Sequence, residues 1–346
     1  MAKESDTVTE QTLRIIPTEE AFATTLQVAE MKKLVENASG YDADLALWAR
    51  MIGGGPLTEQ LLDLDSDRLA IMDAAGIEAQ LLLLTSTGVQ MMPRDTAIAV
   101  AEDANDQLAA AIARHPGRFF GLATVAPQAP AEAVKELERA VTKLGLKAVV
   151  INSHILGEYL DNPKFSEVLE AAEALDVPIY LHPNTPPRGM IGPMLEAGLD
   201  GAIFGFGVET GMHALRMITA GVFDRFPKLQ VIIGHMGEAL PFWLYRLDYM
   251  HQAGIRANRY EFLKPLKKEF VSNYLRENFY ITNSGVAWEP AIKFTQDVIG
   301  KDRVLYAMDY PYQCPPEEVA ILDAMDMSPE DKKMFFQTNA ERVFKL

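Results

Sequence analysis

The chain has 346 residues, of which 49% are hydrophobic and 23% are charged, a balance typical of a soluble globular protein. Its 48 acidic and 32 basic residues give a net charge of −16, which repels phosphates and anionic lipid and excludes nucleic acid and membrane partners. The single cysteine, Cys314, excludes an intramolecular disulfide. With a polar N-terminus and no apolar run of about 20 residues, the chain is expected to be cytoplasmic.

Short apolar segments alternate with segments of helical periodicity along the chain. We expect eight buried parallel strands at 14–22, 79–85, 119–127, 146–153, 178–183, 229–235, 279–284 and 304–311. Helices are expected in all seven connections, including one over about 57–75. This alternation predicts an α/β protein with a (β/α)8 TIM-like barrel. The rival fold, an open doubly wound sheet, usually has a glycine-rich phosphate loop, and the sequence has none.

No linker or repeat divides the chain, so we expect a single barrel domain over residues 1–346. Residues 1–12 are polar and predicted to form a flexible tail. Residues 38–57 and 184–205 interrupt the strand and helix pattern with glycine-rich and proline-rich sequence. We expect these two insertions near the mouth of the barrel.

Four polar residues stand near the ends of separate predicted strands: Glu19, His182, His235 and Asp309. The carboxyl ends of barrel strands meet at one mouth, so these side chains are expected to form an active site. Each has a simpler explanation. Glu19 would suit a helix N-terminus, and His182 would suit a core position. Glu238, three residues after His235, would either cap a helix or turn back to fix the imidazole tautomer.

The residue types at these strand ends suit a divalent metal ion. Carboxylates with imidazoles form a ligand set that favours Zn²⁺ or Mn²⁺. The fourth strand ends in Ile151-Asn152-Ser153-His154 and has no lysine to carry a bridging carbamate, so a single metal is expected.

Two arginines are candidates for binding an anionic substrate, which an acidic protein would otherwise repel. Arg68 lies in the second predicted helix, and Arg246 follows His235 by eleven residues. A guanidinium binds a carboxylate through two parallel hydrogen bonds. A surface or interface ion pair is the alternative for each.

Five motifs, TEEAF, YLHP, GHMGEALPFWLYRLDYMHQAG, TNSGVAWEPAI and YAMDYPYQ, resemble those of the amidohydrolase-related decarboxylases. The group includes enzymes that act on γ-resorcylate and on aminocarboxymuconate semialdehyde. The narrower resemblance is to decarboxylases of 5-carboxyvanillate, in lignin-derived aromatic catabolism. It extends from about Leu13 to Leu346 and is carried by long motifs.

The resemblance implies a distorted (β/α)8 barrel with one divalent metal held by Glu19, His182 and Asp309. It implies that His235 is the active-site histidine and Glu238 its partner. Further residues are implied in substrate binding: Arg68, Arg246, Tyr312 and Thr85. In some relatives the counterpart of Arg246 comes from the neighbouring subunit, which implies a homodimer or homotetramer.

The sequence departs from a common pattern of the group at Ala21. Many relatives have a histidine ligand there, two positions after the first ligand. The missing ligand favours Mn²⁺ over Zn²⁺, and 5-carboxyvanillate decarboxylases share this form.

The expected reaction is the non-oxidative decarboxylation of a hydroxylated aromatic acid, most simply 5-carboxyvanillate to vanillate. Asp309 is the expected proton donor, with His235 the alternative. Three other functions stay open: decarboxylation of γ-resorcylate or 2,3-dihydroxybenzoate, metal-dependent hydrolysis by the same type of barrel, and non-catalytic binding of aromatic acids. Trp48, Met190, Met194 and Phe206 are candidates for shaping the choice of aromatic acid.

Overall fold

The computed structural model describes residues 13–37, 45–51, 54–313 and 316–346. The expected flexible tail at 1–12, Cys314 and parts of the first insertion lie outside the described residues. None of the described helices is long and apolar enough to cross a membrane.

Eight parallel strands form a single sheet in sequence order, which confirms the predicted barrel topology. Their bounds are β1 Glu20–Phe22, β2 Gln80–Leu84, β3 Phe119–Thr124, β4 Ala148–Asn152, β5 Ile179–His182, β6 Val231–Ile233, β7 Phe279–Thr282 and β8 Val304–Leu305. The register brings Asn152 of β4 beside His182 of β5, so the ends of these two strands lie at the same level.

Backbone hydrogen bonds connect the beginning of the sheet to its end. The Thr18 N–H donates to the Tyr306 carbonyl at 3.0 Å, and the Asp309 N–H donates to the Glu19 carbonyl at 3.2 Å. Glu19 therefore lies just before β1, whereas the sequence suggested that it lies near the end of this strand. The reason is that pairing with β2 begins only at Glu20, whereas Thr18 and Glu19 pair with the segment that follows β8.

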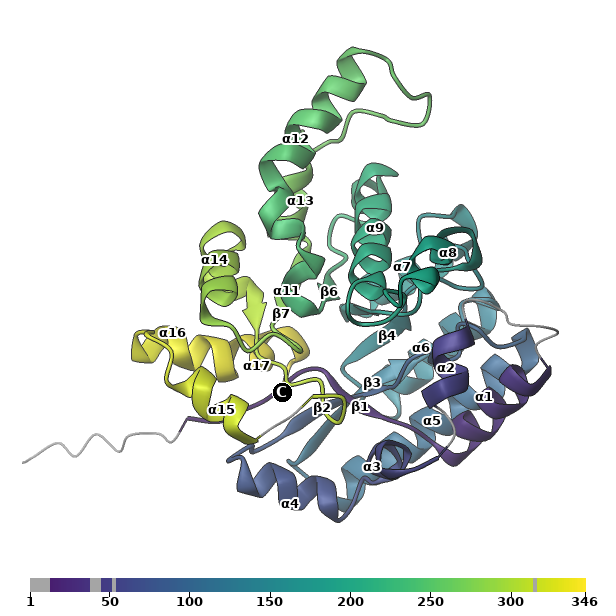
Figure 1. Cartoon of the computed structure of the whole chain (residues 1–346), viewed down its shortest axis with the longest axis vertical. Coiled ribbons are helices and arrows are strands. Elements are labelled where there is room, and N and C mark those ends of the chain that lie inside the picture. The colour runs from purple at the N-terminus through teal and green to yellow at the C-terminus, as the bar shows by residue number, and fades with distance from the viewer. Residues whose placement is uncertain (1–12, 38–44, 52–53, 314–315) are drawn as a thin grey trace, which may run out of the picture.

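Helices cover the sheet on its outer side (Figure 1). The α-helices are α1 Thr25–Asn37, α2 Ala46–Met51, α3 Pro56–Leu62, α4 Asp67–Ala74, α5 Arg94–Arg114, α6 Pro130–Thr142, α7 Ser166–Ala174, α8 Arg188–Glu196, α9 Gly205–Thr219, α10 Val222–Arg225, α11 His235–Glu238, α12 Leu240–Arg256, α13 Val271–Glu277, α14 Glu289–Ile299, α15 Pro316–Asp323, α16 Pro329–Lys333 and α17 Asn339–Phe344. Short helical turns occur at Pro163–Phe165, Lys301–Arg303 and Met334–Thr338.

The helix expected over 57–75 is two helices, α3 and α4, with a turn between them. Asp63 makes this turn, because its side chain accepts hydrogen bonds from the N–H groups of Asp65, Ser66 and Arg68. An aspartate that bonds to nearby backbone competes with helix continuation.

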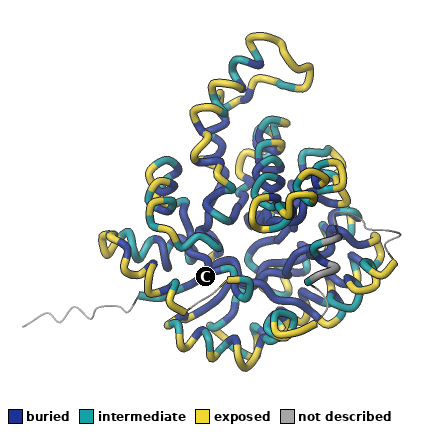
Figure 2. Tube along the Cα trace, viewed as in Figure 1, coloured by how far each residue is buried: buried dark blue, intermediate teal, exposed yellow. Residues whose placement is uncertain are grey.

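Alternate strand residues pack on opposite sides of the sheet, as strand geometry requires. Leu81, Leu83 and Val150 belong to the core inside the barrel. Leu82 and Val149 belong to the larger core between the strands and the helices. Figure 2 shows the strands buried and the exposed residues concentrated on the outer helices and at the far end of α12. Strands buried on both sides explain the continuous apolar runs in the sequence.

Candidate metal and active site

The four residues predicted at strand ends come together in the structure. The Glu19 Oε1 atom lies 3.4 Å from His182 Nε2 and 3.8 Å from His235 Nε2. Donor atoms of Glu19, His235 and Asp309 all lie within 4.8 Å of one another. These side chains come from the segment before β1, the end of β5 and the segments after β6 and β8. One mouth of the barrel thus holds two imidazoles and two carboxylates.

Glu19 is the central residue of this cluster. Its Oε2 accepts hydrogen bonds from the Tyr180 hydroxyl and, at 3.0 Å, from the Thr282 hydroxyl. Its Oε1 is buried without a hydrogen-bond partner, although buried polar atoms are normally paired. A carboxylate oxygen left unpaired between two imidazole nitrogens fits the position of a cation ligand.

His182 is held with one ring nitrogen turned toward Glu19. Its Nδ1 lies 2.9 Å from both the Asn152 Oδ1 and the Ser86 Oγ, and 3.1 Å from the Pro183 carbonyl oxygen. These partners accept the Nδ1 proton, which leaves the Nε2 lone pair facing the cluster, as in a metal ligand. Burial lowers the pKa of His182 to about 4, against the opposing charge of Glu19, so the ring is neutral at pH 7.

His235 and Glu238 form the pair that the sequence suggested, through an unusual turn. Every residue from His235 to Ala239 has a positive φ, between 50° and 70°. Non-glycine residues rarely adopt this conformation, and such strain is concentrated at functional sites. The turn brings Glu238 Oε1 to 2.9 Å from His235 Nδ1. Glu238 is therefore bonded to the imidazole, and helix α12 begins only at Leu240.

The charges in the cluster call for a cation. Burial raises the pKa of Asp309 to about 8, with Glu19 and Glu238 adding to the shift and His235 opposing it. Burial lowers the pKa of His235, but Glu238, Glu19 and Asp309 outweigh it and raise that pKa to about 10. Protons on Asp309 and His235 thus offset the negative charge of the carboxylates. A divalent ion would offset them instead, and this donor set suits Mn²⁺ or Zn²⁺.

The structure groups the metal donors differently from the prediction in one respect. The three residues with mutually close donor atoms include His235, whereas the sequence assigned Glu19, His182 and Asp309 as ligands. His182 still faces Glu19 with a free Nε2. The ligand role of His182 and the proton-handling role of His235 remain predictions.

Glu20 points away from Glu19, as expected for neighbouring residues of a strand. Its Oε1 accepts from the Met308 N–H at 3.0 Å and its Oε2 from the Tyr310 N–H at 3.1 Å. Burial raises the pKa of Glu20 well above its usual value, and these two N–H groups and the charge of Arg68 oppose the shift.

Arg68, one of the predicted substrate-binding residues, is hydrogen-bonded to the chain itself. Its side chain is completely buried, and its guanidinium donates to the carbonyl of Ala21 at 2.6 Å and to the carbonyl of Asp63 at 2.9 Å. A third hydrogen bond reaches the Gln80 side chain at 3.3 Å. These hydrogen bonds tie Arg68 to the chain behind β1, and its role in holding a substrate carboxylate stays a prediction.

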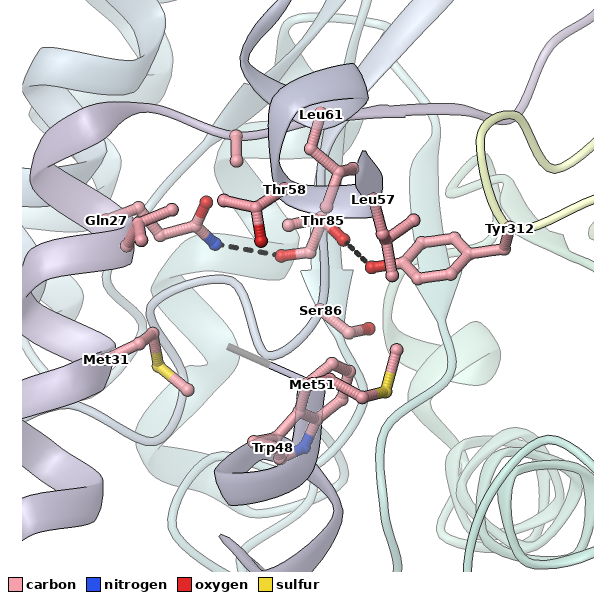
Figure 3. A pocket seen from close by; sticks show the side chains of 12 residues that line it. Gln27, Met31, Trp48, Met51, Leu57, Thr58, Leu61, Thr85, Ser86 and Tyr312 are labelled. Atoms are coloured by element: carbon pink, nitrogen blue, oxygen red, sulfur yellow. Dashed lines mark hydrogen bonds between the residues drawn. The ribbon is translucent and has the colours of Figure 1, made fainter. Parts of the chain in front are cut away.

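Thr85 and Tyr312, the other predicted substrate-binding residues, meet in one pocket beside the cluster (Figure 3). Their hydroxyl groups are hydrogen-bonded to each other. The pocket has a volume of about 40 Å³, and α1, α2 and α3 contribute its other walls. Ser86 lines this pocket and also contacts His182, so the pocket adjoins the metal cluster.

A larger cavity of about 700 Å³ also borders the cluster. His235, Glu238 and Asp309 lie in its wall. Residues 202–204 of the second predicted insertion border it, together with Phe206, on which Trp48 stacks with ring centroids 6.5 Å apart. Met190 and Met194 line neither cavity in the described residues. The volume and the apolar walls suit a small aromatic ligand.

Several residues that complete the site carry no signal in the sequence. Ser86, Asn152, Tyr180 and Thr282 orient His182 or Glu19, yet each is a polar residue within or after an apolar strand. The register of neighbouring strands places them, and register cannot be seen in a single sequence.

Comparison with known proteins identifies the family. The sequence profile of the family described as Amidohydrolase matches residues 41–346. The chain belongs to the amidohydrolase family. Its resemblance to a crystal structure of 5-carboxyvanillate decarboxylase from Novosphingobium aromaticivorans places it in the decarboxylase group. That structure contains manganese and 4-hydroxy-3-methoxy-5-nitrobenzoic acid, is 54% identical, and superposes with a TM-score of 0.94 over 97% of each chain.

Two further relatives agree with this assignment. The 5-carboxyvanillate decarboxylase from Sphingomonas paucimobilis is 40% identical, with a TM-score of 0.92, over 97% of this chain and 100% of that one. The γ-resorcylate decarboxylase of Rhizobium radiobacter is 37% identical over 298 residues, which are 84% of this chain and 90% of the relative. The predicted membership of the aromatic acid decarboxylases is confirmed.

Proposed function

We propose that this protein is a manganese-dependent decarboxylase that converts 5-carboxyvanillate to vanillate. The observation that carries the proposal is the partly buried cluster of Glu19, His182, His235 and Asp309, with an unpaired carboxylate oxygen at its centre. It belongs to a chain that resembles manganese-containing 5-carboxyvanillate decarboxylase over nearly its whole length. The ligand of that relative is 5-carboxyvanillate with a nitro group in place of the ring carboxylate that would leave.

Glu19, His182 and Asp309, with His235 beside them, would hold the Mn²⁺. A bound divalent ion would orient the phenolic and carboxylate oxygens of the substrate and withdraw charge from them. Asp309 would deliver a proton to the ring carbon that bears the carboxylate. Burial raises the pKa of Asp309 to about 8 in the metal-free protein, but a bound cation would lower it, so Asp309 would take up its proton through His235 as the substrate binds. The carbon–carbon bond then breaks, its electron pair returns to the ring, and CO₂ leaves.

His235 has a supporting role in this scheme. A ring nitrogen of His235 lies within 4.8 Å of a carboxylate oxygen of Asp309. The contact between Nδ1 and Glu238 fixes the orientation of the ring. The ring can therefore exchange protons with Asp309 between turnovers. Replacing Asp309 with Asn tests the assignment, because it should abolish turnover while much of the Mn²⁺ binding remains. Activity close to that of the wild type would exclude Asp309 as the donor.

Decarboxylation of γ-resorcylate is the second candidate, supported by the 37% identical enzyme of Rhizobium radiobacter. A panel of 5-carboxyvanillate, γ-resorcylate and 2,3-dihydroxybenzoate, tested on protein of measured metal content, separates the two. In D₂O the proposed reaction releases CO₂ and leaves one deuterium on the ring. Ring-opened products, or products formed without release of CO₂, would indicate a hydrolase. Binding without turnover, unaffected by a chelator, would indicate a non-catalytic protein.

A homodimer is proposed from the surface of α12. This helix extends away from the barrel (Figure 1), and its side chains include Phe242 and Tyr245, which are 77% and 83% exposed. Phe262, in the loop beyond α12, is 88% exposed. Large exposed aromatic side chains gathered on one surface mark a protein interface. We propose that a second copy of this chain covers this surface, and that Arg246, exposed on the same helix, reaches the partner's site.

Sedimentation of the metal-loaded protein tests the dimer. A dimer or a tetramer built from dimers supports the proposal, and a fully active monomer would refute it. The cytoplasmic location also remains a prediction, supported by the single cysteine, which suits a reducing compartment.

A further inference from the structure

Glu20 fastens the backbone on both sides of Asp309. Its two carboxylate oxygens accept hydrogen bonds from the N–H groups of Met308 and Tyr310, at 3.0 and 3.1 Å. Glu20 is completely buried, and Met308 and Tyr310 are almost completely buried. Hydrogen bonds from buried N–H groups to a carboxylate are among the stronger ones in proteins.

Asp309 needs this support because its own backbone is strained. Its φ is +71°, in the left-handed region that residues other than glycine rarely occupy. Such a conformation is strained and persists only where the surroundings impose it. The Asp309 N–H donates to the Glu19 carbonyl, so the N–H groups of three successive residues, 308–310, are all held by Glu19 and Glu20.

Arg68 supports Glu20 from behind. Its guanidinium lies over the ring of Tyr310, 4.6 Å from the centroid, and donates to the carbonyl of Ala21, the residue after Glu20. The positive charge of Arg68 also acts on the Glu20 carboxylate. The segment that carries Asp309 is therefore enclosed between a buried carboxylate and a buried guanidinium.

We propose that Glu20 is a positioning residue, whose carboxylate holds residues 308–310 in the conformation that turns the Asp309 side chain toward Glu19 and His235. The inference rests on the proposed function, because it explains how Asp309 is kept in place for metal binding and proton transfer. Glu20 itself faces away from the cluster and is not a ligand.

The test is Glu20→Gln, which keeps the shape of the side chain but turns one acceptor oxygen into a donor. Residues that orient metal ligands typically change metal affinity or activity by about 10–100-fold when mutated. We expect Mn²⁺ affinity, measured by calorimetry, to fall by at least about 10-fold. The kcat should fall by a similar factor, with KM changed less.

Glu136→Gln is the matched control. Glu136 is a buried carboxylate on α6 that pairs with Arg139 at 2.8 Å and accepts a hydrogen bond from Asn105, away from the cluster. This variant should lose thermal stability but bind Mn²⁺ as the wild type does. A purely structural role for Glu20 predicts the same behaviour for Glu20→Gln, and that result would overturn the proposal.

If Glu20→Gln does not fold, Glu20→Asp answers the same question. It keeps the charge opposite Arg68 but is one methylene too short to hold both N–H groups, so Mn²⁺ affinity should again fall. Wild-type affinity in Glu20→Asp would refute the positioning role. Failure of the proposed function would be recognised separately, as a wild-type protein that binds Mn²⁺ without decarboxylating any acid of the panel.

Discussion

Replacement of Arg68 with Met distinguishes a structural arginine from a substrate-binding one. The variant keeps most of the apolar stem but removes donors to Ala21, Asp63 and Gln80. Leaving the partners of a buried charged group unpaired costs about 3–5 kcal/mol. For 346 residues, an unfolding entropy of about 2.1 cal/mol/K per residue gives about 0.7 kcal/mol/K, so Tm should fall by about 6 °C.

Thermal unfolding and steady-state kinetics of the same preparation provide the assay. Arg94→Met serves as the control, because Arg94 is exposed and forms an ion pair with a surface aspartate, Asp95. The Tm of this variant should hardly change. If Arg68 instead bound a substrate carboxylate, Arg68→Met would leave Tm near that of the wild type. It would then raise KM by about 10–150-fold, the equivalent of a lost charged hydrogen bond. That pair of results would refute the structural role, and Arg68→Lys allows the same comparison if the Met variant is insoluble.

Four further predictions concern the site. Glu238→Gln removes the largest of the charges that raise the pKa of His235. A spectroscopic titration should then show the His235 pKa below about 10, and activity should fall about 10–100-fold. An unchanged titration would contradict the pairing of His235 with Glu238. The pKa of Asp309 is raised from its usual 3.8 to about 8 in the folded protein. Between these two values the folded protein binds a proton that the unfolded chain does not bind. The metal-free protein should therefore lose stability as the pH rises from 4 to 8. Mn²⁺ must displace this proton when it binds. Calorimetry at pH 7 in two buffers should therefore detect proton release, and the affinity for Mn²⁺ should increase with pH. The absence of proton release would contradict the raised pKa of Asp309. Finally, Arg246→Ala and Asp309→Asn chains, each inactive alone, should regain part of the activity as mixed dimers, whereas no recovery would place Arg246 in its own subunit's site.

The barrel could be predicted from the sequence because its strands are buried on both sides and therefore appear as continuous apolar runs. All eight predicted strands occur, each inside or overlapping its expected segment. The boundaries were less certain where local polar contacts compete with the pattern, as at Asp63, which divides one predicted helix into two. The position of Glu19 before β1 depends on pairing with the segment after β8, which no local pattern reveals.

The cluster was predictable because Glu19, His182, His235 and Asp309 are polar residues that interrupt apolar runs. The contact between His235 and Glu238 followed from their spacing, although the left-handed turn that makes it did not. The role of Arg68 could not be decided from the sequence, because a structural arginine and a ligand-binding arginine look alike there. The structure adds its hydrogen bonds to backbone carbonyls, which favour a structural role.

The pairing of Glu19 with the segment after β8 has a consequence for how the protein is made. Glu19 is synthesised long before Asp309, with most of the barrel between them. The two meet only where the first and last strands of the barrel join. A nascent chain therefore has no complete metal site until synthesis has passed Asp309. In the folded protein, an ion held by both residues would link the segment before β1 to the segment after β8.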